Sequence, residues 1–172
     1  MERKQKNKTV QLCITALFMA LTCIFTMVIR VPIPLGYAHL GNSIIFLAVF
    51  YFSTTGGIIA GSIGSAMADL LSGFSQWIIP TLIIKAALAF TAAVIGKKKQ
   101  QWKLFSLRTI IAVTLSMAVM VIGYTVSGAI MYGGIAAGLA STPGLIAEGV
   151  VNIIAFYLFA AAFSKVKVKG DY

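Results

Sequence analysis

Long apolar stretches alternate with short polar segments along the whole chain. A helix needs about 20 mainly apolar residues to cross a bilayer. The apolar stretch over residues 40–72 is too long for one such helix, and the Thr54-Thr55-Gly56-Gly57 cluster within it is the natural break. The pattern therefore predicts six helices, over residues 10–29, 40–54, 56–72, 78–96, 109–132 and 144–163.

Proline and glycine mark the segments between these helices. The proline pair in residues 30–40 cannot continue a helix, so we expect a loop there. Residues 73–77 are expected to turn before Pro80, which suits the first turn of the fourth helix. The glycine- and alanine-rich residues 133–143 predict a third loop, with or without helical turns of its own.

The basic residues predict the orientation of the chain in the membrane. All of them except Arg30 and Lys85 lie in three clusters: before the first helix, between the fourth and fifth, and after the last. Loops rich in lysine and arginine stay on the cytoplasmic side. Six helices place all three clusters there, whereas five would separate them. We therefore predict an all-α integral membrane protein, a six-transmembrane-helix bundle in one domain over residues 1–172, with cytoplasmic N and C termini.

Composition agrees with a membrane protein and excludes several other classes. Hydrophobic residues make up 59% of the chain and charged residues only 10%, whereas soluble domains carry about 25% charged residues. The net charge of +10 does not indicate nucleic-acid binding, because the basic residues flank apolar spans. Cys13 and Cys23 are placed for neither a disulfide nor a metal site. The chain has no catalytic or phosphate-binding motif, so we expect no enzyme activity, cofactor or metal.

Three ionisable side chains, Asp69, Lys85 and Glu148, lie inside the apolar stretches. A charge at the bilayer centre costs about 2.5–3.5 kcal/mol on insertion scales, so such residues normally face a bundle interior or an aqueous cavity. Asp69 and Lys85 are expected at similar depth, where they either pair with each other or reach a polar ligand. Glu148 and Asn152 are four residues apart and share a helix face, where they either contact a ligand or hold helices together.

Aromatic and amide groups cluster in the predicted outer loops. Tyr37, His39 and Asn42 lie in YAHLGNSIIF, and Trp77 lies in the next loop. Such groups supply stacking faces and directional hydrogen bonds to a flat heterocycle. A tryptophan at this position equally suits an interfacial belt without any ligand, and a lone histidine is more often structural. Because several helices and loops converge on one polar layer, we favour a binding site.

Small residues at a spacing of four predict close helix packing. Ala16 and Ala20 lie on one face of the first helix, and Gly57 and Gly61 begin a ridge on the third. Such faces let helix backbones approach closely in lipid. They serve either packing within the bundle or contact with a partner subunit.

The chain contains, in this order, the segments ALFMA (16–20), YAHLGNSIIF (37–46), GSIGSAMADLLSG (61–73) and WIIPTLIIKAAL (77–88). This ordered set resembles the substrate-binding S component of an energy-coupling factor (ECF) vitamin transporter, most closely the riboflavin-type subfamily. The resemblance implies high-affinity binding of a water-soluble vitamin or precursor in an outer pocket, in a bacterial cytoplasmic membrane. It also implies association with a membrane-embedded T subunit and two cytoplasmic ATPase subunits that hydrolyse the ATP. On that model Ala16, Ala20, Gly57 and Gly61 would face the T subunit.

The identity of the ligand stays open at this point. Asn42 stands where relatives often have Asp, and the STPGLIAEG segment (141–149) differs from riboflavin- and thiamin-binding patterns. Few aromatic residues favour a small ring such as hydroxymethylpyrimidine or pyridoxine, with riboflavin and pantothenate as alternatives. The rival class is a structural or assembly subunit of a membrane complex. The predicted substrate-binding residues are Tyr37, His39, Asn42, Asp69, Trp77, Lys85, Glu148 and Asn152.

Overall fold

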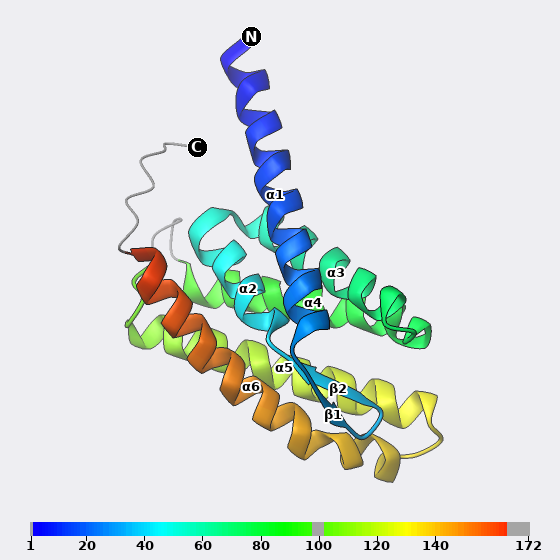
Figure 1. Cartoon of the computed structure of the whole chain (residues 1–172). Helices are drawn as coiled ribbons and strands as arrows, with labels where there is room; N and C mark the ends of the chain where they lie inside the picture. The colour runs from blue at the N-terminus through cyan, green and yellow to red at the C-terminus, as the bar shows by residue number, and fades with distance from the viewer. Residues whose placement is uncertain (1, 98–101, 165–172) are drawn as a thin grey trace.

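The computed structural model describes residues 2–97 and 102–164, in which six α-helices form a bundle and a short antiparallel β-hairpin lies against it (Figure 1). The N-terminal part of the first helix extends beyond the rest of the bundle in Figure 1. The α-helices are α1 (Glu2–Val28), α2 (Gly41–Leu47), α3 (Thr54–Leu71), α4 (Ile78–Gly96), α5 (Leu107–Met131) and α6 (Ile135–Ser164). The shorter elements are β1 (Arg30–Ile33), β2 (Gly36–His39), the π-helical turn η1 (Ala48–Phe52) and the 3₁₀ turn η2 (Ser75–Trp77).

Four segments of the described chain are long and apolar enough to cross a membrane. They are Lys8–Val28, Ser75–Gly96, Leu107–Met131 and Ile135–Phe163. The second helical segment, Gly41–Phe52, is apolar but shorter. The prediction of a multi-pass, mainly helical membrane bundle with six helices is confirmed. That all six helices cross the membrane stays a prediction, because four described segments are long and apolar enough to do so, and the orientation of the termini also stays a prediction.

The second and third helices meet at Ser53, one residue before the predicted break. The backbone of Ser53 is extended, and its side chain accepts a hydrogen bond from the N–H of Gly56. Serine is among the best N-cap residues because its oxygen satisfies a free N–H of the first helical turn. The α4 bounds, residues 78–96, are those predicted from the sequence.

The first predicted loop contains a β-hairpin. Arg30 pairs with His39 and Ile33 with Gly36, and Leu35 in the turn has a φ of 66°. Proline fits in such a strand because the hairpin has only edge strands, on which a missing N–H can face outward. Each strand has only four residues and β1 contains Pro32, so no alternation of apolar and polar positions could be read from the sequence.

The prediction of a loop over residues 133–143 was wrong. Only a short turn separates α5 from α6, with Gly133 and Gly134 at φ values of 79° and 155°, and Pro143 lies inside α6. A Cβ at Gly138 would overlap the Thr125 carbonyl of α5, so the two helices are in close contact there. Packing of this kind stabilises the helix although proline removes one of its backbone hydrogen bonds.

Gly57 and Gly61 are buried inside the bundle, so the prediction that they face a partner subunit is not supported. A Cβ at Gly57 would lie 2.6 Å from Val49 of η1, and one at Gly61 would lie 2.8 Å from Ile45 of α2. The glycines therefore let α3 approach the α2–η1 segment. Ala16 and Ala20, in contrast, are exposed on α1.

Candidate ligand-binding site

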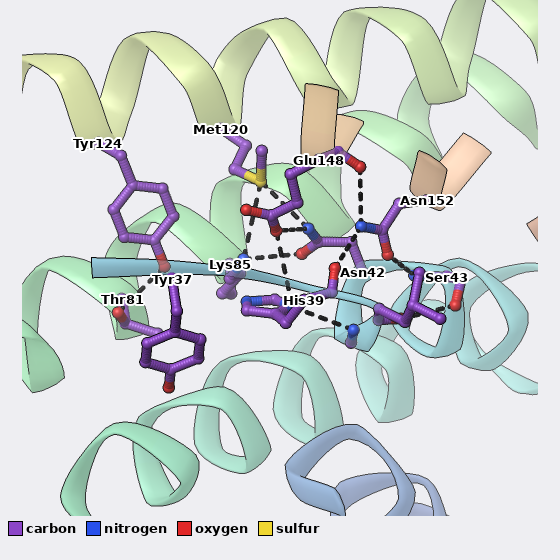
Figure 2. Close-up of polar contacts among 12 residues, drawn as sticks. Tyr37, His39, Asn42, Ser43, Thr81, Lys85, Met120, Tyr124, Glu148 and Asn152 are labelled. Atoms are coloured by element: carbon purple, nitrogen blue, oxygen red, sulfur yellow. Dashed lines mark hydrogen bonds and ion pairs between the residues drawn. The ribbon is translucent and has the colours of Figure 1, made fainter. Parts of the chain in front are cut away.

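A chain of buried polar groups crosses the interior from α4 through α2 to α6 (Figure 2). The Lys85 ammonium donates to Asn42 Oδ1 at 2.7 Å, and Asn42 Nδ2 donates to Glu148 Oε1 at 2.7 Å. The Met120 sulfur of α5 lies 3.1 Å from the same amide nitrogen. Lys85 and Asn42 are 0% exposed and Glu148 is 5% exposed. Asn42 therefore connects the cation to the carboxylate.

Asn152 ties the hairpin and the start of α2 to α6. Its Oδ1 accepts from the Ser43 N–H at 2.9 Å, and its Nδ2 donates to the His39 carbonyl at 2.6 Å and the Glu148 carbonyl at 2.9 Å. The amide thus binds the buried N–H of Ser43 and the partly buried carbonyl of His39 where α2 begins. It holds the hairpin in place beside the polar layer (Figure 2).

Asp69 belongs to a separate group of hydrogen bonds. It accepts from the Tyr37 hydroxyl at 3.0 Å and from the Thr81 hydroxyl at 2.5 Å, and Thr81 also lies 3.0 Å from the Tyr124 hydroxyl. Among the described residues no ion pair joins Asp69 to Lys85, so the predicted alternative that the two neutralise each other as a direct pair was wrong. Burial and the Asp69 carboxylate raise the pKa of Tyr37, which keeps this hydroxyl a donor.

His39 is a neutral imidazole with a defined tautomer. Its Nδ1 accepts the Gly41 N–H at 3.0 Å, so the ring proton is on Nε2. Burial and then the positive charge of Lys85 lower the pKa of His39 well below its usual range. The 3.6 Å contact between Nδ1 and Glu148 Oε1 is therefore not an ion pair at neutral pH.

A cavity lies between the hairpin and the ends of α3 to α6. Tyr37, His39, Asp69 and Trp77 line it, as does a further set that the sequence analysis missed, including Phe74, Thr81, Tyr124 and Ser141. The empty volume is ≈ 490 Å³ with its open mouth included, and the centres of water molecules can occupy ≈ 50 Å³ of it. The indole N–H of Trp77 is buried and has no hydrogen-bond partner among the described residues.

The predicted site residues thus fall into two adjoining groups. Tyr37, His39, Asp69 and Trp77 lie on the cavity wall. The polar layer consists of Asn42, Lys85, Glu148 and Asn152. None of these four residues lines the cavity. His39 belongs to both groups, because it lines the cavity and contacts Glu148.

Residues 6–165 match the family model of the ECF-type riboflavin transporter, S component. The chain belongs to this family. It is therefore a transporter component and not an enzyme, and it is a membrane protein of vitamin uptake whose ATPase partners are other subunits.

Two relatives are similar to this S component over more than two thirds of their own length. The thiamine precursor transporter HmpT of Lactococcus lactis subsp. cremoris (strain MG1363) is 30% identical over 131 residues, which is 74% of this chain and 72% of HmpT. A protein of Pyrococcus woesei, described as an uncharacterized protein in a gap 3′ region, is 33% identical over 110 residues, 63% of this chain and 71% of the relative.

Proposed function

We propose that this S component is the high-affinity binding subunit of an ATP-driven ECF importer for a thiamine precursor, and that its ligand is hydroxymethylpyrimidine. The observation that carries the proposal is the buried, unpartnered indole N–H of Trp77 on the wall of a small cavity that also holds the Asp69 carboxylate. Buried polar groups almost always have a hydrogen-bond partner, so an orphan donor needs an explanation. A ligand acceptor in the cavity supplies one.

The chemistry of the wall suits an aminopyrimidine. Each carboxylate oxygen of Asp69 accepts one hydrogen bond from the protein and has capacity for a second, so it can take a ligand amino group. Trp77 can donate to a ring nitrogen or hydroxyl of the ligand. The aromatic rings of Phe74, Trp77 and Tyr124 offer faces for stacking.

The size of the cavity favours a single ring. Each water molecule needs about 10–15 Å³ of the space that water centres can occupy. The ≈ 50 Å³ of such space in this cavity therefore holds about four waters. This enclosed space is comparable with one substituted six-membered ring, so the three-ring system of riboflavin would have to extend into the open mouth of the cavity. Pantothenate is disfavoured because its carboxylate would face Asp69. Pyridoxine, also a single ring, is the second candidate, and the thiamine precursor is preferred because of the likeness to HmpT.

In this proposal the protein works in a bacterial cytoplasmic membrane with the cavity open to the outside. It delivers its ligand to a complex with a T subunit and two ATPase subunits, where the ATP is hydrolysed. The rival proposal is an assembly subunit whose polar layer only holds helices together. That rival leaves the orphan Trp77 N–H without a role.

Calorimetry with the purified protein and a panel of vitamins and precursors tests the function. We expect tight binding of hydroxymethylpyrimidine and weak or no binding of riboflavin and pantothenate. Mass spectrometry of ligand released from protein purified from a vitamin-containing culture is the independent check. If no small molecule is released and nothing in the panel binds, the assembly role is favoured instead.

The two tryptophans provide a matched test of the site. Trp77→Phe keeps an aromatic ring and removes the N–H, so it should weaken binding about tenfold, the equivalent of one hydrogen bond. Trp102 packs against Phe50 and Tyr51, away from the cavity, so Trp102→Phe should bind as wild type does. It also leaves Trp77 as the sole tryptophan, whose fluorescence should change on ligand addition. Equal affinity in both variants would contradict the role of Trp77.

A further inference from the structure

Asn42 occupies a position that requires one acceptor and one donor. Its Oδ1 accepts from Lys85 Nζ and its Nδ2 donates to Glu148 Oε1, both at 2.7 Å. An aspartate here could accept from Lys85 but, when ionised, could not donate to Glu148. The amide therefore lets one cation and one carboxylate share a buried bridge.

The bridge has no net charge. With Lys85 and Glu148 both ionised the charges cancel, and with the proton moved from Lys85 to Glu148 both groups are neutral. The sum is the same in either proton arrangement. Because these residues are buried, water screens any added charge poorly.

The bridge lies one side chain behind the cavity wall. The Lys85 ammonium is 5.1 Å from the centroid of the Tyr124 ring, and Glu148 Oε1 is 3.6 Å from His39 Nδ1. Tyr124 and His39 both line the cavity. A change of one charge in the bridge would therefore act on a ligand at short range.

On the basis of the proposed function, we propose that Asn42 is a positioning residue that sets the charge preference of the site. By keeping the Lys85–Asn42–Glu148 bridge neutral, it prevents the bridge from adding a preference for a cationic or an anionic ligand to that of the cavity wall. The acidic group on the cavity wall, Asp69, is the same in all variants below, so only the charge of the bridge changes. At an effective dielectric constant of about 20 and a separation of about 8 Å, one charge changes affinity by about 10- to 30-fold.

The test compares two ligands of nearly the same shape. One is 4-amino-5-hydroxymethyl-2-methylpyrimidine, and the other is its 5-aminomethyl analogue, whose primary amine carries a positive charge at neutral pH. The measured quantity is the ratio of the two dissociation constants, obtained by calorimetry at pH 7.5. The ratio cancels any general loss of affinity that a variant causes.

Three variants change or restore the charge of the bridge. Asn42→Asp adds a negative charge and should shift the ratio at least about tenfold toward the cation, whereas Glu148→Gln removes one and should shift it about tenfold toward the neutral ring. The double variant Asn42→Asp/Glu148→Gln exchanges carboxylate and amide, so that Lys85 and the amide introduced at position 148 both donate to position 42. It should restore the wild-type ratio.

The control is Gln76→Glu, which adds the same charge at an exposed position outside the bridge and should leave the ratio unchanged. If one single variant fails to fold, the other single variant and the double variant still give the comparison. Ratios that stay constant across folded variants, or a double variant that does not return to the wild-type ratio, overturn the inference. If the wild type binds neither pyrimidine, the proposed function itself fails, which is a different outcome.

Discussion

Replacing Asn152 with alanine should destabilise the protein more than a typical loss of one polar side chain. The substitution removes one acceptor of the buried Ser43 N–H, which keeps its bond to the Leu40 carbonyl at 3.2 Å, and it removes the donor to the partly buried His39 carbonyl. The substitution also removes the hydrogen bond from Asn152 to the Glu148 carbonyl, but this carbonyl lies within α6 and can still accept from the helix backbone. The His39 carbonyl is thus the backbone group that loses its partner.

The expected magnitude follows from this one group. An unsatisfied group of this kind costs about 1–3 kcal/mol, so the loss is about 2 kcal/mol. For a domain of this size that corresponds to a fall in Tm of about 6 °C. Thermal unfolding of the detergent-solubilised protein, followed by circular dichroism and by size-exclusion chromatography, measures the shift.

Ser62→Ala is the matched control for this experiment. The Ser62 hydroxyl is also buried, but it donates to the Ile58 carbonyl of its own helix, which keeps its backbone bond when the hydroxyl is removed. Its loss should cost under about 1 kcal/mol. If Asn152→Ala unfolds at the same temperature as Ser62→Ala, the reasoning about the orphaned His39 carbonyl is refuted.

Three further predictions concern other parts of the molecule. Ala16→Trp enlarges an exposed position of α1, so it should leave ligand binding intact and block co-purification of the T subunit; undiminished co-purification would remove this face from the interface. Gly138→Ala should lower stability by about 1–3 kcal/mol because a Cβ would overlap the α5 backbone, whereas Gly149→Ala in the same helix makes only ordinary contacts; equal melting temperatures would contradict the close packing. Because burial lowers the pKa of His39, the unfolded state binds a proton first as pH falls below about 6.5, so stability should decrease from pH 7 to pH 5. His39→Asn keeps an acceptor for Gly41 and should flatten that pH dependence of Tm; an unchanged slope would show that other groups cause it.

The helices could be predicted because lipid imposes a length on each apolar span. Hydropathy, together with the turn expected over residues 73–77 and the position of Pro80, gave the bounds of α4. The cost of a buried charge placed Asp69, Lys85 and Glu148 in the interior. The glycine- and alanine-rich composition of residues 133–143 misled the prediction, because Gly138 is in close contact with α5 and α6 continues through this segment, including Pro143. Such contacts between distant segments have no signature in local sequence.

The pairing of the polar residues could not be predicted from spacing. Whether Lys85 meets Asp69 or Asn42 depends on how α2, α3 and α4 are rotated about their axes, and the sequence does not specify those rotations. One signal for the missed residues was present. Thr81 lies four residues before Lys85, on the same face of α4, so it was a candidate for the same site.

The short second helix has a consequence for how the chain enters the membrane. Every residue of α2 is buried, and α2 contacts α1, α3, α4 and α6. Gly41–Phe52, with its 12 residues, is only about 18 Å long, while the hydrocarbon core of a bilayer is about 30 Å thick. A segment of that length cannot stand alone as a membrane span, and lipid would leave the amide of Asn42 without its partners. We therefore expect the second helix to insert only together with its neighbours, so that the polar bridge is assembled as the bundle closes around it.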